Sequence, residues 1–379
     1  MNEKEQNITT GEWPPKGDGH HDSALFVNEG VEQQPSVNPY MKNFFRKKPV
    51  LLSAEEYVKG IEEGNTTILS KAITLVESQL PAHREIARQI IARCQHISAK
   101  KSSMRIGITG VPGAGKSTFI EAFGKYLTAE GHKLAVLAID PSSERSKGSI
   151  LGDKTRMETL CNDPNAFIRP SPSAGSLGGV ARKTRETILL CEAAGYDVIF
   201  IETVGVGQSE TAVHSMSDFF LLLMLSGAGD DLQGIKRGIM EMSDLIAITK
   251  ADGNNIDKAN MAKALYANAL HLFPPTESGW VPTAVTSSAV TKEGLEEILK
   301  LIEQYFALVK GNGYYLHKRR QQARYWMYES INEALREDFY ENPLIEKKLK
   351  EYENAVLDGS MDSFMAAGEL MEIYNNIKE

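Results

Sequence analysis

A glycine-rich segment at residues 110–117, GVPGAGKS, matches the phosphate-binding pattern G-x-x-x-x-G-K-[ST]. It follows a predicted strand and precedes a predicted helix, so backbone N–H groups and the positive end of the helix can surround a phosphate. Lys116 would reach the β- and γ-phosphates of a nucleotide, and the Ser117 hydroxyl would bind Mg²⁺. The predicted phosphate-binding residues are Gly110, Val111, Pro112, Gly113, Ala114, Gly115, Lys116, Ser117 and Thr118.

A second motif, Thr-Lys-Ala-Asp at residues 249–252, predicts which base is bound. A carboxylate at Asp252 can accept hydrogen bonds from N1–H and the 2-amino group of guanine. Adenine has no such pair of donors, so ATP would leave a buried Asp252 unpaired, which is costly. The Lys250 stem would pack over the base, and the segment from Ser287 fits a loop that contacts guanine O6. The predicted base-binding residues are Lys250, Asp252, Ser288, Ala289 and Val290. The expected ligands are therefore GTP and GDP.

Three carboxylates are candidates for the metal side of the site. Glu202 closes the apolar run 197–201, where a carboxylate holds Mg²⁺ directly or through water, and the nearby Gly205 N–H can sense the γ-phosphate. Asp140 follows the run 134–139, and Asp153 lies in GSILGDKTR. Mg²⁺ usually takes only one or two carboxylates and keeps several waters. The predicted order is therefore Ser117, then Glu202, with Asp140 and Asp153 farther from the metal or on the attacking water. A solvated loop acid remains the alternative for Asp153.

Predicted strands alternate with predicted helices from residue 104 to residue 305, and these elements must position the residues named above. Short β-rich apolar runs separated by helical stretches predict a parallel sheet with helices on both faces, the P-loop NTPase type of α/β fold. The runs cover residues 105–109, 134–139, 197–201, 219–225, 245–249 and 280–285. The predicted organisation is a flexible arm (1–52), a helical N-terminal domain (53–103), a P-loop GTPase domain (104–305) and a helical C-terminal region (306–379). The apolar stripes of the last region fit either an intramolecular core or a dimer interface.

The composition excludes several other classes of protein. The 379 residues hold 42 Lys plus Arg against 50 Asp plus Glu, a formal net charge of -8, which argues against a nucleic-acid partner. The longest apolar run, residues 219–225, is far shorter than the roughly 18 residues of a membrane span. The start, MNEKEQ, does not resemble a secretory signal. Three cysteines without close spacing predict neither disulfides nor a zinc site, so a reducing cytoplasm is the expected compartment.

Several longer segments together resemble the methylmalonyl-CoA mutase-associated GTPases, which are called MeaB in bacteria and were once labelled ArgK. These segments are AITLVES (72–78), GVPGAGKST (110–118), DPSS (140–143), GSILGDKTRM (148–157), RPSPSAGSLGGVARKTRE (169–186), ETVGVGQSE (202–210) and GAGDDLQGIKRGIMEMSDLIAITKADG (227–253). The resemblance is dense over residues 54–305 and looser in the helical tail.

The resemblance implies a SIMIBI-class P-loop GTPase that works as a nucleotide-dependent homodimer and hydrolyses GTP slowly to GDP and phosphate. Members of this family bind adenosylcobalamin-dependent methylmalonyl-CoA mutase, gate cofactor delivery from the cobalamin adenosyltransferase, and protect or reactivate the mutase. The resemblance also implies that the loop 227–237, with Lys236 as its matching lysine, couples nucleotide state to the partner. The segment with Gly205, Val206 and Gln208 would sense the γ-phosphate. The implied catalytic residues are Lys116, Asp153, Gly205 and Lys236.

Two positions depart from the family pattern. Residues 144–148 read ERSKG where the family often has Thr-Gly, which affects the first switch loop, and Thr249 stands where Asn is usual. Many GTPases tolerate Thr there, so GTP remains the expected ligand. The alternative function is that of an ATP-dependent kinase of an arginine/ornithine periplasmic transport system, as the older label suggests. Two mutases, acting on methylmalonyl-CoA or isobutyryl-CoA, remain alternatives as the partner.

Overall fold

A computed structural model describes residues 51–78, 80–139, 157–170, 177–203, 209–226 and 237–378. It divides the chain into two units, Met1–Leu51 and Leu52–Glu379. Every helix and strand given below belongs to the second unit. None of the helices among these residues is both long enough and apolar enough to cross a membrane.

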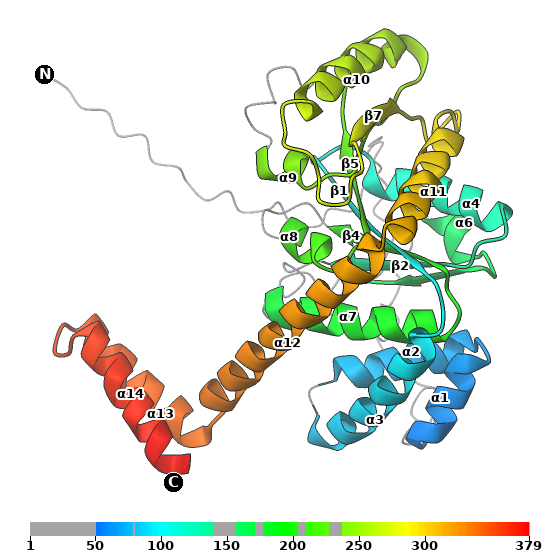
Figure 1. The fold of residues 1–379 in the computed structure, drawn as a ribbon. Helices are drawn as coiled ribbons and strands as arrows, with labels where there is room; N and C mark the ends of the chain where they lie inside the picture. Colours follow the sequence, from blue (N-terminus) through cyan, green and yellow to red (C-terminus); the bar gives the residue numbers. More distant parts are fainter. Residues whose placement is uncertain are drawn as a thin grey trace, which may run out of the picture. The chain divides into compact units, whose positions relative to one another are not determined.

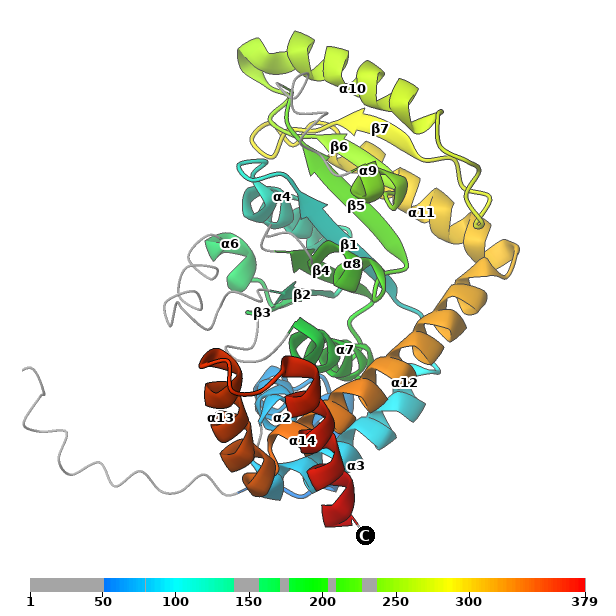
Figure 2. The same ribbon diagram turned by 90° about the vertical axis from the view of Figure 1, so that its left-hand side faces the viewer.

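The second unit is built on a seven-stranded sheet in which all neighbouring strands run parallel (Figure 1). The strands are β1 (Met104–Gly110), β2 (Leu134–Ile139), β3 (Ala166–Arg169), β4 (Val198–Thr203), β5 (Phe219–Met224), β6 (Leu245–Ile248) and β7 (Thr283–Thr286). Their order is β3-β2-β4-β1-β5-β6-β7, and Figure 2 shows it running from β7 beside α10 to β3. The α/β fold with a parallel sheet is therefore confirmed. The six predicted runs are strands, and β3 is an additional one.

Helices cover both faces of this sheet because successive side chains of a strand point to opposite sides. On β5, Phe219 and Leu221 pack against α4 (Lys116–Ala129) and α11 (Leu295–Gly311). The alternate residues of β5, Phe220 and Leu222, face the other layer. That layer consists of α7 (Leu177–Ala193), α8 (Ser209–His214), α9 (Arg237–Glu241) and α10 (Ile256–Leu270). Burial on both faces explains why the strands read as continuous apolar runs.

An aspartate comes directly before each of three strands, at the end of the sheet opposite the phosphate-binding loop. The Asp197 carboxylate accepts the Lys133 N–H at 2.7 Å, and Asp218 accepts the Arg105 N–H at 3.0 Å. Asp244 accepts the backbone N–H of residue 220 at 2.9 Å. Each aspartate thus satisfies a backbone donor of the neighbouring strand where the ladder begins, and a buried unpaired donor would be costly.

Helices also precede and follow the sheet. The N-terminal ones are α1 (Ala54–Glu62), α2 (Thr66–Glu77) and α3 (Pro81–Ser98), and the C-terminal ones are α12 (Tyr314–Tyr340), α13 (Pro343–Leu357) and α14 (Ser363–Lys378). Ser53 and Glu56 form a capping box at the start of α1. The N-terminal helices share an apolar core with α7 and β2. The domain boundaries at residues 103 and 305 stay predictions, and α11 continues past 305 to Gly311.

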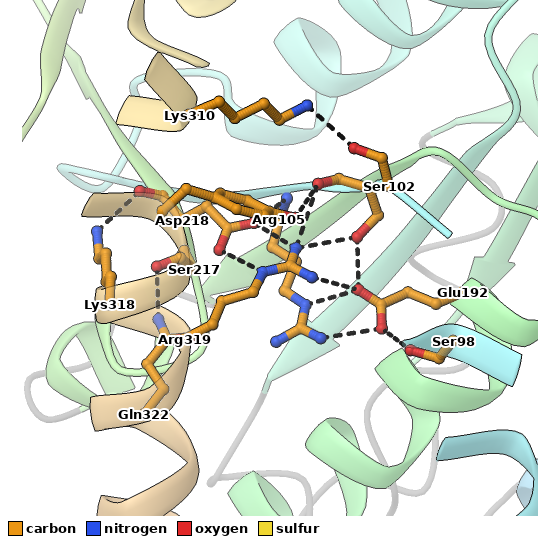
Figure 3. Close-up of polar contacts among 12 residues, drawn as sticks. Ser98, Ser102, Arg105, Glu192, Ser217, Asp218, Lys310, Lys318, Arg319 and Gln322 are labelled. Carbon is orange, nitrogen blue, oxygen red and sulfur yellow. Dashed lines mark hydrogen bonds and ion pairs between the residues drawn. The ribbon is translucent and has the colours of Figure 1, made fainter. Parts of the chain in front are cut away.

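A buried charge network joins α3, β1, α7 and α12 at the base of the sheet (Figure 3). Glu192, only 2% exposed, accepts two hydrogen bonds from the Arg105 guanidinium at 2.8 and 2.9 Å. Ser98 and Ser103 donate to the same carboxylate. Burial alone would raise the pKa of Glu192, but Arg105, Arg319 and Ser103 together lower this pKa to about 2. The carboxylate is therefore a paired anion that holds these elements together.

Candidate nucleotide-binding site

The phosphate-binding segment forms the turn between the end of β1 at Gly110 and the start of α4 at Lys116. Gly113 and Gly115 have φ values of 80° and 79°, a left-handed conformation that favours glycine. Among the described residues, no side chain caps the N-terminus of α4. The first N–H groups of this helix can therefore donate hydrogen bonds to an anion. The positive end of the helix dipole attracts the same anion.

The Lys116 ammonium lies within this turn and donates to the Gly110 carbonyl at 3.1 Å. Burial lowers the pKa of Lys116, while the negative charges of Glu202 and Glu210 partly offset this effect. A charged ammonium in a partly buried loop is a strong binder of phosphate oxygens. The predicted residues Ser117 and Thr118 occupy the first turn of α4 beside it. Pro112 and Gly113 are exposed, and Val111 and Gly115 are half-buried.

Thr249 connects the predicted base-binding motif to the phosphate-binding turn. Its hydroxyl donates to the carbonyl of Ala114 at 2.8 Å and also approaches the Met224 carbonyl at 3.0 Å. Thr249 is buried at the end of β6, so its side chain ties the neighbouring strands to the turn. Thr249, which stands where Asn is usual in the family pattern, thus makes a short hydrogen bond to the turn.

The next two motif residues lie beside this link. Lys250 adopts a left-handed conformation with φ 56°, and its Cε would lie 3.8 Å from a Cβ atom on Gly115. The Lys250 stem therefore runs next to the phosphate-binding turn. The Asp252 carboxylate Oδ2 accepts the Ser288 hydroxyl at 2.5 Å. Ser288 thus orients the carboxylate that is predicted to read the base.

The loop after β7 carries the remaining predicted base contacts. The Ser288 hydroxyl accepts the N–H groups of Val290 at 3.2 Å and Thr291 at 3.1 Å, which folds the loop around it. Ala289 is half-buried, whereas the Val290 side chain is 79% exposed. The Ser287 hydroxyl is buried and has no hydrogen-bond partner within the described part of the chain.

The metal side of the site is described only in part. Glu202 is 6% exposed near the end of β4 and lies in register with Ile108, two residues before the phosphate-binding turn. The Thr203 and Thr109 hydroxyls bond to each other at 2.9 Å across the same two strands. A serine hydroxyl and a carboxylate are oxygen donors of the kind that Mg²⁺ takes, so the residues present fit this ion. The predicted residues Asp140, Asp153, Gly205 and Lys236 lie outside the described residues.

Two further residues, which the sequence did not assign to the site, lie at the start of the helix that follows β4. Glu210, the second residue of α8, is 9% exposed, and its charge acts on Lys116. Ser209 is fully buried, and its hydroxyl has no partner among the residues described. These two residues are the last two of the segment ETVGVGQSE. The sequence feature that could have identified Glu210 is an acidic residue at the start of a helix, eight positions after Glu202.

Replacing Thr249 with Val tests the polar link to the turn. Val has nearly the same shape but leaves the Ala114 carbonyl without this donor, so affinity for GDP should fall about 2- to 10-fold. Titration with a fluorescent GDP analogue measures the change. Thr286→Val at the end of β7 is the matched control, because its hydroxyl makes no hydrogen bond to a described residue. Equal affinities in the two variants would show that the link does not position the turn.

This chain is similar to known proteins over most of its length. A family model described as methylmalonyl-CoA mutase-associated GTPase MeaB matches residues 69–344. A putative GTPase of Caulobacter vibrioides is 48% identical over 311 residues, covering 82% of this chain and 94% of the relative. The mitochondrial methylmalonic aciduria type A homolog of Mus musculus is 45% identical over 325 residues, covering 84% and 78%. GTPase ArgK of Escherichia coli is 42% identical over 317 residues, covering 84% and 95%.

A solved structure agrees with these matches. The crystal structure of a LAO/AO transport system kinase has a TM-score of 0.66 and 35% sequence identity, and the match covers 86% of this chain and all of that one. The family model spans well over half of the present chain, across the sheet and the phosphate-binding turn. The chain therefore belongs to the family of methylmalonyl-CoA mutase-associated GTPases, the MeaB family.

Proposed function

We propose that this protein is a GTP-hydrolysing chaperone that binds an adenosylcobalamin-dependent acyl-CoA mutase, with methylmalonyl-CoA mutase as the expected partner. It would gate cofactor loading and protect or reactivate the mutase. The observation that carries the proposal is the Asp252 carboxylate, held by Ser288 beside the phosphate-binding turn, in a chain of this family. The partner is inferred from the family name and from relatives named after methylmalonic aciduria.

The site residues would divide the work of binding and hydrolysis. Asp252 would read guanine, Thr249 would hold the turn in position, and Lys116 would neutralise charge on the β- and γ-phosphates. Ser117 and Glu202 would hold Mg²⁺, which supplies further charge neutralisation at the phosphates when it is bound. Such sites act mainly by positioning the reactants and stabilising charge, so a water in line with the γ-phosphate completes the arrangement.

Residues outside the described part of the chain complete this proposal. Asp140 and Asp153 would act farther from the metal or on the attacking water. Gly205 would sense the γ-phosphate, and Lys236 would lie in the loop that reports nucleotide state to the mutase. The cobalamin adenosyltransferase, as the source of the cofactor, is the second proposed partner, and the cytoplasm is the proposed location.

The C-terminal helices support the proposal of a homodimer. Helices α12, α13 and α14 enclose an apolar groove of about 430 Å³. Its lining includes Phe339, Leu349, Tyr352, Val356, Leu370 and Met371. Near it, Leu357 and Phe364 are 80% and 86% exposed. Exposed apolar groups gathered in this way are typical of an interface, and a second copy of the chain is the proposed occupant.

The test is a pull-down of purified methylmalonyl-CoA mutase by this protein without nucleotide, with GDP and with a non-hydrolysable GTP analogue. We expect capture of the mutase to change with the nucleotide, because a ligand that favours one state shifts the populations of both. The Lys116→Ala variant should lose this response. Capture that is indifferent to nucleotide would contradict the switch, and no capture would contradict the choice of partner.

The alternative is an ATP-dependent kinase of a transport system, and the solved relative described as a LAO/AO transport system kinase favours it. Competition between GTP and ATP for the site separates the two functions. The Asp252 carboxylate favours GTP, because adenine offers no donor pair to it.

A further inference from the structure

The first half of helix α12 is hydrogen-bonded to the turn 215–218, which connects α8 to β5. Gln322 Nε2 donates to the Ser217 carbonyl at 2.8 Å, and Trp326 Nε1 donates to the Ser215 carbonyl at 3.2 Å. One turn earlier, Lys318 donates to the carbonyl of residue 218 at 2.8 Å, and Arg319 forms a two-point ion pair with the Asp218 carboxylate. Figure 3 shows Lys318, Arg319 and Gln322 reaching from α12 towards this turn.

These contacts occupy one face of α12. Residues 318 and 319 precede residue 322 by four and three positions, and residue 326 follows it by four, a spacing that places them on one side of a helix. Gln322 and Trp326 are the two buried residues of α12 within the described chain. A displacement of α12 would therefore pull directly on the turn 215–218.

The same turn packs against β1, the strand that leads into the phosphate-binding turn. A Cβ atom on Gly107 would lie 2.4 Å from the Ser217 hydroxyl and 2.8 Å from Val213 of α8, so only glycine leaves room for this approach. Asp218 and Arg105 also exchange hydrogen bonds, at 2.8 Å and 3.0 Å. Interiors are close-packed and transmit strain, so the turn cannot shift without moving β1, three residues before the phosphate-binding turn.

The other end of α8 lies at the nucleotide site. This helix is six residues long and packs against β1 and β4. Its second residue, Glu210, is buried, and its negative charge helps to keep Lys116 protonated. One short helix thus packs against β1, the strand that leads into the P-loop, and continues into the turn that α12 holds.

We propose that α12 is an allosteric arm of the nucleotide site, coupled to the P-loop through the turn 215–218 and α8. Nucleotide binding would then change the stability of the contacts that α12 makes, and a change imposed on α12 would alter nucleotide affinity to the same extent, because such linkage is reciprocal. The inference rests on the proposed function for its ligand, a guanine nucleotide at the P-loop. It assigns Gln322 and Trp326 as positioning residues that do not touch that ligand.

The variant Gln322→Leu removes the link to Ser217, and the cost of leaving that carbonyl without its donor is partly offset by the loss of a buried amide. Gln322 Oε1 is already buried without a partner among the described residues, and Leu has a similar volume. The ratio of the affinities for a GTP analogue and GDP should change about fivefold or more, the lower end of typical allosteric coupling. Hydrogen exchange in α12 should respond to nucleotide in the natural protein and lose this response in the variant.

The chain provides matched controls at adjacent positions. Gln321→Leu makes the same change on the exposed side of α12 and should leave both readouts unaltered. Trp326→Phe, with Tyr325→Phe as its control, repeats the test at the second contact and serves if Gln322→Leu does not fold.

Two results would overturn the proposal. One is a natural protein that binds guanine nucleotides with no nucleotide-dependent exchange in α12. The other is a Gln322→Leu or Trp326→Phe variant that behaves as its control does. If the natural protein still binds guanine nucleotides, either result would contradict the coupling but not the proposed function. Failure of the natural protein to bind any guanine nucleotide would contradict the proposed function and this inference together.

Discussion

Replacing Asp252 with Asn is expected to lower the affinity for GTP by about 10²- to 10⁴-fold, since each hydrogen bond to a charged group contributes about 1.5–3 kcal/mol and two are lost. The amide presents a donor where the carboxylate accepted the guanine N1–H and amino groups. Xanthine carries a carbonyl in place of the 2-amino group, so the variant should prefer xanthosine triphosphate. The Ser288 hydroxyl can bond to the amide as it does to the carboxylate, which keeps the side chain in place.

Competition of GTP, ATP and xanthosine triphosphate for a labelled nucleotide measures this change in preference. Asp257→Asn is the matched control, because Asp257 is exposed in the first turn of α10, a few residues from the site. That variant should keep the natural preference. A preference for GTP that survives in Asp252→Asn would refute the assignment of this residue to the base.

Replacing Lys116 with Ala is expected to reduce the affinity for GTP and GDP by about 100-fold or more, because charge-assisted hydrogen bonds to two phosphates are lost. Lys116 is partly buried, and its ammonium donates to the Gly110 carbonyl at 3.1 Å. Its removal also takes a cation away from the buried Glu202 and Glu210 carboxylates. The variant should therefore lose nucleotide-dependent stabilisation as well as binding.

Thermal unfolding with and without GDP tests this second expectation, since a ligand stabilises only the state that binds it. Lys125→Ala is the control on the same helix. Lys125 pairs with Asp163, away from the phosphate-binding turn, so this variant should be less stable but should keep the shift caused by GDP. Equal shifts in the two variants would show that Lys116 does not contact the nucleotide.

Most of the fold could be predicted from the sequence because its central strands are buried on both faces. The run at residues 219–225 has no polar interruption, and it corresponds to β5, whose residues are all buried. The strand β3 was missed for the opposite reason. It has four residues, all only half-buried, at the edge of the sheet, so it lacks both length and a strong apolar signal.

In the candidate site, too, some features could be predicted from the sequence and others could not. The segment 110–117 could be recognised because its function depends on local spacing, which places a left-handed glycine before the helix that Lys116 begins. The departure at Thr249 could not be interpreted from sequence, since its partner Ala114 is 135 residues away. The order of β1, β5 and β6 in the sheet brings the two together.

The sequence by itself determined the P-loop and the family and predicted the guanine-reading motif, because each depends on residue types at short, fixed spacings. Tertiary structure alone decided that Ser288 orients Asp252 and that α12 holds the turn beside Gly107. These contacts join strands and helices whose neighbours are set by the packing of the sheet. No local pattern encodes such pairings, because side chains far apart in the chain meet only when the shared core forms.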